Sequence, residues 1–116
     1  MPIIRQADLS ASEPFPGVSS IPILTKDGSS HNLTVLLITI SPGERIPLHY
    51  HPDHDEGMYV MEGNIEATLG PETQSVETGD AVLATTGTPH QMANLSQKPA
   101  VIMAIFPTSE VKRVLL

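Results

Sequence analysis

The chain has 116 residues, no cysteine and a formal net charge of −7 with histidine neutral. This length fits one domain, and the lack of cysteine excludes disulfides and thiolate metal sites. The acidic balance argues against nucleic acid or an anionic membrane as the partner. The longest apolar stretch, residues 33–40, is too short to span a bilayer, and no secretory signal opens the chain. We therefore expect a single-domain cytoplasmic protein.

Proline and glycine separate short runs of apolar and β-branched residues along the whole chain, which is typical of all-β barrels and sandwiches. The expected strands are residues 21–25, 33–40, 46–51, 58–61, 65–69, 74–77, 81–84, 89–95 and 100–106. An Asp-Gly pair at residues 27–28 predicts a hairpin turn, and Gly63 predicts another hairpin. Residues 109–115 fit either one helical turn or a further strand.

This pattern indicates an all-β fold, a single barrel or jelly roll. We divide the domain into three parts, which are an N-terminal strand segment at 1–30, a barrel core at 31–106 and a C-terminal tail at 107–116. Residues 33–40 are apolar on both faces, and residues 100–106 form a second apolar strand that needs covering. Strands of this kind lie inside a sandwich or under a second subunit, so a homodimer is expected.

Four residues stand out as candidate metal ligands. His49 and His51 lie two apart on an expected strand, so both side chains point to one face. Glu56 begins what we expect to be a neighbouring antiparallel strand, where its carboxylate can reach the same point. His90 begins another strand much later in the chain. Each of these residues alone is more often a polar surface or core residue than a ligand.

Taken together, the residues match two motifs of a known family. The first motif is Gly, five residues, His-x-His, four residues, Glu, six residues and Gly, and it is filled by Gly43, His49, His51, Glu56 and Gly63. The second is Gly, five residues, Pro-x-Gly, two residues, His, three residues and Asn. It is filled by Gly79, Gly87, His90 and Asn94, with Thr85 in place of the proline. Residues 43–94 therefore resemble the cupin superfamily, in particular its small single-domain type.

The resemblance implies the double-stranded β-helix of cupins, with one divalent metal bound inside the barrel by His49, His51, Glu56 and His90. Neutral imidazoles and one carboxylate suit a borderline transition metal, and an octahedral shell leaves positions open for water, oxygen or substrate. These ligands do not choose between Fe, Mn, Ni, Cu and Zn. Asn94 is expected to tie a turn through hydrogen bonds to the backbone.

Strand alternation also predicts residues around the metal. Met58 and Val60 should lie on the same side as Glu56, and Met92 on the same side as His90. This arrangement predicts an adaptable apolar pocket for a small-molecule ligand, or else ordinary core packing.

His54 is the fourth candidate pocket residue, beside Met58, Val60 and Met92. It lies in the loop between the first-motif ligands, where an imidazole can carry protons near the mouth of the barrel. The simpler interpretation is a solvated loop residue between two aspartates.

The ligand set favours a small metal-dependent enzyme. Its activity is expected to be a dioxygenase-like oxidation of a small organic substrate, or a Lewis-acid isomerase, lyase or cyclase reaction. Glu56 is the candidate catalytic base. The alternative is a non-catalytic cupin that binds or senses a small ligand or a metal. A third possibility, a barrel that serves only as a scaffold, makes no use of the complete ligand set.

Overall fold

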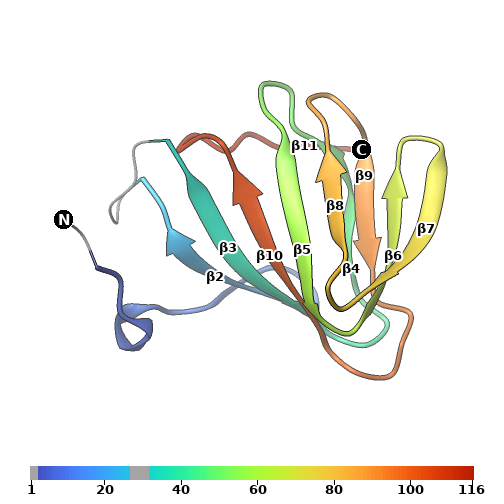
Figure 1. Ribbon diagram of the computed structural model, residues 1–116, viewed down its shortest axis with the longest axis horizontal. Coiled ribbons are helices and arrows are strands. Elements are labelled where there is room, and N and C mark those ends of the chain that lie inside the picture. The colour runs from blue at the N-terminus through green and yellow to red at the C-terminus, as the bar shows by residue number, and fades with distance from the viewer. Residues whose placement is uncertain (1–2, 27–31) are drawn as a thin grey trace.

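The protein, seen in a computed structural model, is described over residues 3–26 and 32–116. These residues form two antiparallel sheets that enclose one core (Figure 1). The one helical element in this part of the chain is a short 3-10 helix, Gln6–Asp8. Within the same residues, no helix is long and apolar enough to cross a membrane. The turn predicted at residues 27–28 lies outside the described ranges.

The larger sheet has six strands and the smaller has five, and every pair of neighbours is antiparallel. In spatial order the larger sheet contains β1 (Ser12–Phe15), β2 (Val18–Leu24), β3 (Thr34–Ile40), β10 (Ala100–Phe106), β5 (Glu56–Glu62) and β8 (Ala81–Ala84). The smaller sheet contains β11 (Val114–Leu115), β4 (Arg45–Tyr50), β9 (His90–Ala93), β6 (Asn64–Leu69) and β7 (Glu72–Glu77). This is the jelly-roll barrel expected from the sequence.

The core lies between the two sheets. Alternate side chains of β10 are at most 2% exposed, and they are Ala100, Ile102, Ala104 and Phe106. They belong to the same apolar cluster as Val60 of the larger sheet and Ile65 and Met92 of the smaller one. Burying one large aliphatic side chain of this kind contributes about 1.5–3 kcal/mol, so the packing of the two sheets dominates the stability of the fold.

Two short edge strands complete the barrel. β1 was not expected, because its sequence Ser-Glu-Pro-Phe has no alternation of apolar and polar residues. Of the two structures expected at residues 109–115, the strand forms and the helical turn does not. β11 pairs with β4 in a register that places Leu115 opposite His49. The tail after residue 107 therefore runs back along the strand that carries the first histidine.

Two sequence predictions about strand pairing are wrong. β5 and β6 do not form a hairpin, because they belong to different sheets and the chain crosses the sandwich at Gly63. Likewise, β5 is not a neighbour of β4, since the first lies between β10 and β8 and the second between β11 and β9. Glu56 therefore faces the histidines from the opposite sheet.

The crossing at Gly63 can be tested with a matched pair of glycines. Gly63 and Gly79 have nearly equal positive φ angles, +95° and +94°. A Cβ at Gly63 would lie 3.0 Å from the Cα of Ala100, whereas at Gly79 nothing lies within 4 Å. Gly79→Ala should lower the free energy of unfolding by about 1–2 kcal/mol through the backbone conformation alone. Gly63→Ala should cost at least about 1 kcal/mol more, because two of the three nearest atoms are backbone atoms and the third is the Cβ of Ala100.

Urea unfolding of both variants measures this difference. Equal losses of stability in the two variants would contradict the close contact at the crossing.

Candidate metal centre

Four buried side chains from three strands and one loop meet at one end of the barrel. His49 lies near the end of β4, His51 directly follows that strand, and His90 opens β9 opposite His49. Glu56 is the first residue of β5 in the other sheet. One ligand atom from each residue lies within 4.8 Å of those of the other three. The structure therefore brings together the whole ligand set that the sequence predicted.

Each histidine of the cluster is held by a backbone carbonyl. The Nδ1 atoms of His49, His51 and His90 lie 2.7, 2.6 and 2.9 Å from the carbonyl oxygens of Pro47, Lys112 and Thr88. A carbonyl only accepts hydrogen bonds, so in each ring Nδ1 carries the hydrogen and donates it. The neutral ring then presents the lone pair of Nε2 on its other side, as metal-ligating histidines do.

These lone pairs face a carboxylate. Glu56 Oε1 lies 3.0 Å from the Nε2 atoms of both His51 and His90, and both rings are at most 2% exposed. Two neutral rings in this tautomer would aim electron pairs at a negatively charged oxygen. Such a buried arrangement is stable only when a cation, a proton or a metal ion, lies between the atoms. The donor set thus fits one divalent metal ion.

Without a metal, ring protons bind Glu56. Burial acts to raise the pKa of Glu56, but hydrogen bonds from His51 and His90 outweigh it and lower the pKa from 4.5 to about 2. For His49, burial is the main effect and lowers the pKa from 6.5 to about 4, with the charge of a protonated His90 acting in the same direction. His49 therefore keeps a free Nε2 lone pair at neutral pH, which is the state that binds a metal.

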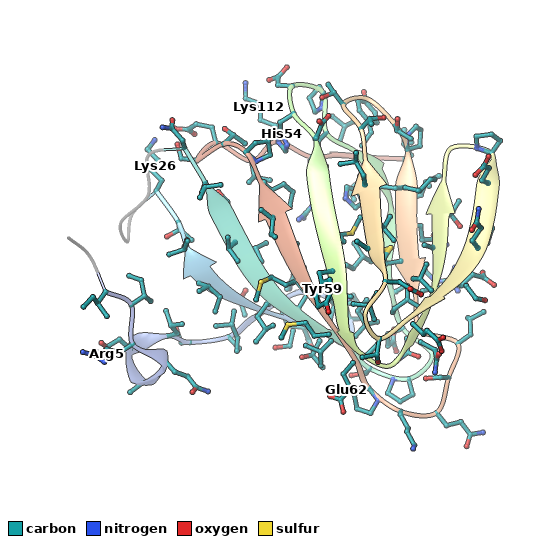
Figure 2. The ribbon with its side chains drawn as sticks, in the orientation of Figure 1. Arg5, Lys26, His54, Tyr59, Glu62 and Lys112 are labelled. Atoms are coloured by element: carbon teal, nitrogen blue, oxygen red, sulfur yellow. The ribbon has the colours of Figure 1, made fainter. Side chains whose placement is uncertain are left out.

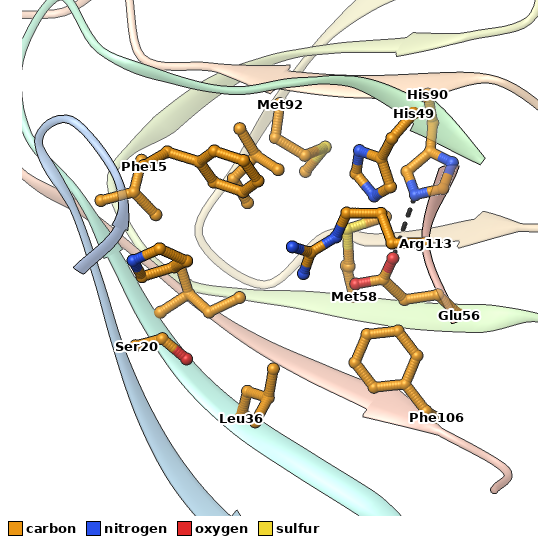
Figure 3. Close-up of a pocket in the computed structure, with 14 residues that line it drawn as sticks. Phe15, Ser20, Leu36, His49, Glu56, Met58, His90, Met92, Phe106 and Arg113 are labelled. Carbon is orange, nitrogen blue, oxygen red and sulfur yellow. Dashed lines mark hydrogen bonds and ion pairs between the residues drawn. The ribbon is translucent and has the colours of Figure 1, made fainter. Parts of the chain in front are cut away.

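A cavity opens beside the cluster (Figure 3). It encloses about 430 Å³ of empty space including its open mouth, but the centre of a water molecule can reach only about 30 Å³ of it. Met58 and Met92 line this space together with Phe15 and Phe106. Its polar lining residues are Ser20, His49, Glu56, His90 and Arg113. The cavity is narrow and apolar, with the polar groups of the cluster in its wall.

Two of the four candidate pocket residues do not line this cavity. Val60 is fully buried in the apolar core. His54 is not a solvated loop residue, because it is only 7% exposed and stacks on His51 with 4.8 Å between ring centroids. Its Nδ1 donates to the carbonyl of Asp55, and its Nε2 accepts the N–H of Lys112. The charged neighbours Asp53 and Asp55 indicate an exposed loop, so the sequence does not predict this burial.

Asn94 ties a turn, as the second motif predicted. Its side-chain amide donates to the carbonyls of Ile40 and Lys98, and its oxygen accepts from the N–H and hydroxyl of Ser96. The residue is fully buried, so each of these bonds replaces one to water. The sequence does not predict that Phe15 and Arg113 line the cavity. Phe15 belongs to β1 and Arg113 to the C-terminal tail, and neither residue is part of a motif.

Comparison with known proteins places this geometry in context. The profile of the family described as "Cupin domain" matches residues 36–106. The tetracenomycin polyketide synthase protein TcmJ of Streptomyces glaucescens is 34% identical over 71 residues, which cover 60% of this chain and 48% of that protein. Quercetin 2,3-dioxygenase of Bacillus subtilis is 32% identical over 68 residues, 59% of this chain and 20% of the enzyme. The matched region thus spans about half or less of these two curated relatives.

Among solved structures, the polyketide cyclase RemF from Streptomyces resistomycificus superposes with a TM-score of 0.81. The match covers all of this chain and 87% of RemF, at 21% sequence identity. At that identity the likeness establishes the shared fold alone.

The two lowered pKa values predict how the metal-free protein responds to acid. Between pH 6.5 and 4, the ring of His49 is protonated to a greater extent in the unfolded chain than in the folded one. The same holds for the carboxylate of Glu56 between pH 4.5 and 2. The free energy of unfolding should therefore fall as the pH drops from 6.5, with a slope approaching about 1.4 kcal/mol per pH unit for each group.

Urea unfolding of protein dialysed against EDTA, from about pH 7 to about pH 4, measures this slope. His49→Gln should lose the His49 contribution to the slope between pH 6.5 and 4.5, because it removes the buried titrating ring. A wild-type stability that stays constant over this range would contradict the predicted coupling.

Proposed function

Because this chain belongs to the cupin family, we propose that it is a small metal-dependent enzyme. The cofactor is one divalent transition metal held by His49, His51, Glu56 and His90. The proposed activity is a dioxygenase-like oxidation of a small organic substrate, or a Lewis-acid isomerase, lyase or cyclase reaction. Among the relatives, quercetin 2,3-dioxygenase has a name that denotes the first class, and TcmJ is named as part of a polyketide synthase.

The observation that carries the proposal is the pair of 3.0 Å contacts between Glu56 Oε1 and the Nε2 atoms of His51 and His90. With each Nδ1 donating to a carbonyl, these atoms need a cation among them. The bound metal would supply Lewis-acid or redox chemistry to a substrate in the adjoining cavity. The apolar walls around Met58 and Met92 exclude water and favour an organic substrate.

Glu56 is also the proposed catalytic base. A carboxylate with a pKa of about 2 is a weak base while the two rings donate to it. Its basicity rises only when its oxygen turns away from the rings and from the cation, toward the cavity that it lines. The proton from the substrate would then move to Oε1.

A non-catalytic role is the second candidate. Apart from the cluster, the cavity lining contributes only two polar side chains from the described residues, Ser20 and Arg113. Neither a serine hydroxyl nor a guanidinium is among the usual general acids and bases of enzymes. This sparse lining suits a site that binds or senses a small ligand or a metal without turning it over. In either role the cytoplasm is the proposed location.

The protein is further proposed to form a homodimer through the outer face of the larger sheet. Tyr59, Leu83 and Ile105 are 46%, 59% and 40% exposed on this face. Leu83 and Ile105 both lie opposite Gly57, which has no side chain, so a shallow hollow forms between them. A second copy of the same apolar face would fill it.

The metal proposal predicts a sharp difference between two glutamates on β5. Glu56→Gln should weaken the binding of Mn(II) or Zn(II) by more than about 100-fold, because it removes the charged ligand. Glu62→Gln is the control, since Glu62 is the last residue of the strand that Glu56 begins. In Figure 2 it lies at the opposite end of the barrel from His54, the ring that stacks on His51. Isothermal titration with each metal measures both. Equal affinities in the two variants would contradict the proposed ligand set.

Turnover separates the two candidate functions. Protein reconstituted with Fe(II) or Mn(II) should consume oxygen with a diketone, a catechol or a flavonol if it is a dioxygenase-like enzyme. Glu56→Gln should abolish that uptake. Tight binding of such compounds with no oxygen uptake and no other product would favour the non-catalytic role. A variant that keeps both the metal and full turnover would exclude Glu56 as the base.

The dimer predicts that a charge on the exposed sheet face will separate the subunits. Leu83→Glu should weaken dimerisation at least about tenfold, because the carboxylate would be buried without a partner. Leu95→Glu is the control, since Leu95 is 63% exposed and lies outside this face. Sedimentation velocity at micromolar concentration distinguishes the species. A monomeric wild-type protein would refute the proposal.

A further inference from the structure

We propose that Arg113 binds a carboxylate of the substrate, so that the ligand of this site is a small organic acid with a second oxygen group for the metal cluster. The inference deepens the proposed function and rests on it for the second contact. Arg113 comes from the C-terminal tail, outside both sequence motifs. Its side chain nevertheless lines the same cavity as His49, Glu56 and His90 (Figure 3).

The side chain of Arg113 is exposed to solvent, where it lines the cavity and stacks on an aromatic ring. It lies over the ring of Phe15, with Cζ 5.1 Å from the ring centroid. Within residues 3–26 and 32–116, no carboxylate lies within 4.0 Å of it. Stacking on an aromatic face leaves the planar edge of the guanidinium free, and that edge matches a carboxylate through two parallel hydrogen bonds.

Charge complementarity favours an anion in the cavity. A divalent metal with one carboxylate ligand has a formal charge of about +1, and Arg113 adds a second positive centre. Glu56 is the one acid among the lining residues, and its charge is directed to the histidines. Between the two positive centres the walls are apolar, with Met58, Met92 and Phe106 on them. A ligand that satisfies all of these groups has an apolar middle and an oxygen group at each end.

The backbone of Lys112 holds Arg113 in place. Its carbonyl accepts a hydrogen bond from Nδ1 of His51 at 2.6 Å, and its N–H donates to Nε2 of His54 at 3.1 Å. The Lys112 side chain forms an ion pair with Asp53 at the surface. Lys112 lies at the top of Figure 2, beside His54. The side chain of the next residue, Arg113, lines the cavity. The metal cluster and the anion-binding residue are therefore fixed to each other through His51.

Calorimetric titration of the Mn(II)-loaded protein with malonate, succinate and glutarate tests the inference. Each dicarboxylate is compared with the monocarboxylate of equal carbon number. At least one dicarboxylate should bind the wild-type protein about tenfold more tightly than its monocarboxylate. Arg113→Gln should remove this advantage. Arg113→Lys should keep part of it, because the charge remains but the two-pronged geometry is lost.

Arg5→Gln is the matched control, because Arg5 is exposed on the N-terminal segment and does not line the cavity. It should bind all the acids as the wild type does. Thermal unfolding followed by circular dichroism checks that each variant is folded. The inference is overturned if Arg113→Gln keeps the advantage of the dicarboxylate, or if the wild type shows no such advantage for any acid in the series.

A prior titration with Mn(II) alone separates this inference from the proposed function. The wild type and Arg113→Gln should bind the metal equally, since Arg113 is not a ligand. If the wild type and Arg113→Gln bind neither Mn(II) nor Zn(II), the proposed function fails. The same acids are then titrated into metal-free protein, where a weaker affinity of Arg113→Gln than of the wild type supports a carboxylate on Arg113. Equal affinities there overturn the inference.

Discussion

Electrostatic balance among four buried groups determines how this barrel is built at one end. Three imidazoles donate their Nδ1 hydrogens to backbone carbonyls, and two of them turn their remaining nitrogens toward one carboxylate oxygen at 3.0 Å. Removed from water, these electron-rich atoms repel one another unless a positive charge joins them. The carbonyls that fix the rings belong to Pro47, Thr88 and Lys112, so the loop before β9 and the tail are part of the same arrangement.

Because the ligands come from both sheets, the cluster depends on the packing of the whole sandwich. Glu56 belongs to the six-stranded sheet, whereas His49 and His90 are opposite one another in the five-stranded sheet. Their distance is set by the apolar residues between the sheets, including Ile102 and Phe106, which are almost fully buried. Any change in that spacing would move the carboxylate relative to the rings.

The sequence was informative where local periodicity carried the signal. The two-residue spacing of His49 and His51 predicted rings on one face, and the motif spacing predicted the whole ligand set. Pairing between distant strands has no such signal, so the sequence wrongly predicts Glu56 on a strand next to the histidines and Gly63 in a hairpin. Such contacts are decided by the packing of the core as a whole, not by adjacent residues.

The residues that complete the cavity were missed for a related reason. Phe15 lies on a short polar edge strand, and Arg113 lies in a tail with ambiguous periodicity. For His54, the charged neighbours Asp53 and Asp55 indicate a solvated residue. In the folded protein its ring packs against His51 and Phe106, and the N–H of Lys112 in the tail donates to it.

The attachment of the tail has an evolutionary consequence. Both hydrogen bonds that fix residue 112 to His51 and His54 use its peptide group, and neither uses its side chain. These two contacts with the histidines are thus independent of which amino acid occupies position 112. Mutations at residues 112 and 113 can accumulate in a lineage without displacing the histidines. A barrel of this design can acquire a different ligand preference through its tail while its cluster remains unaltered.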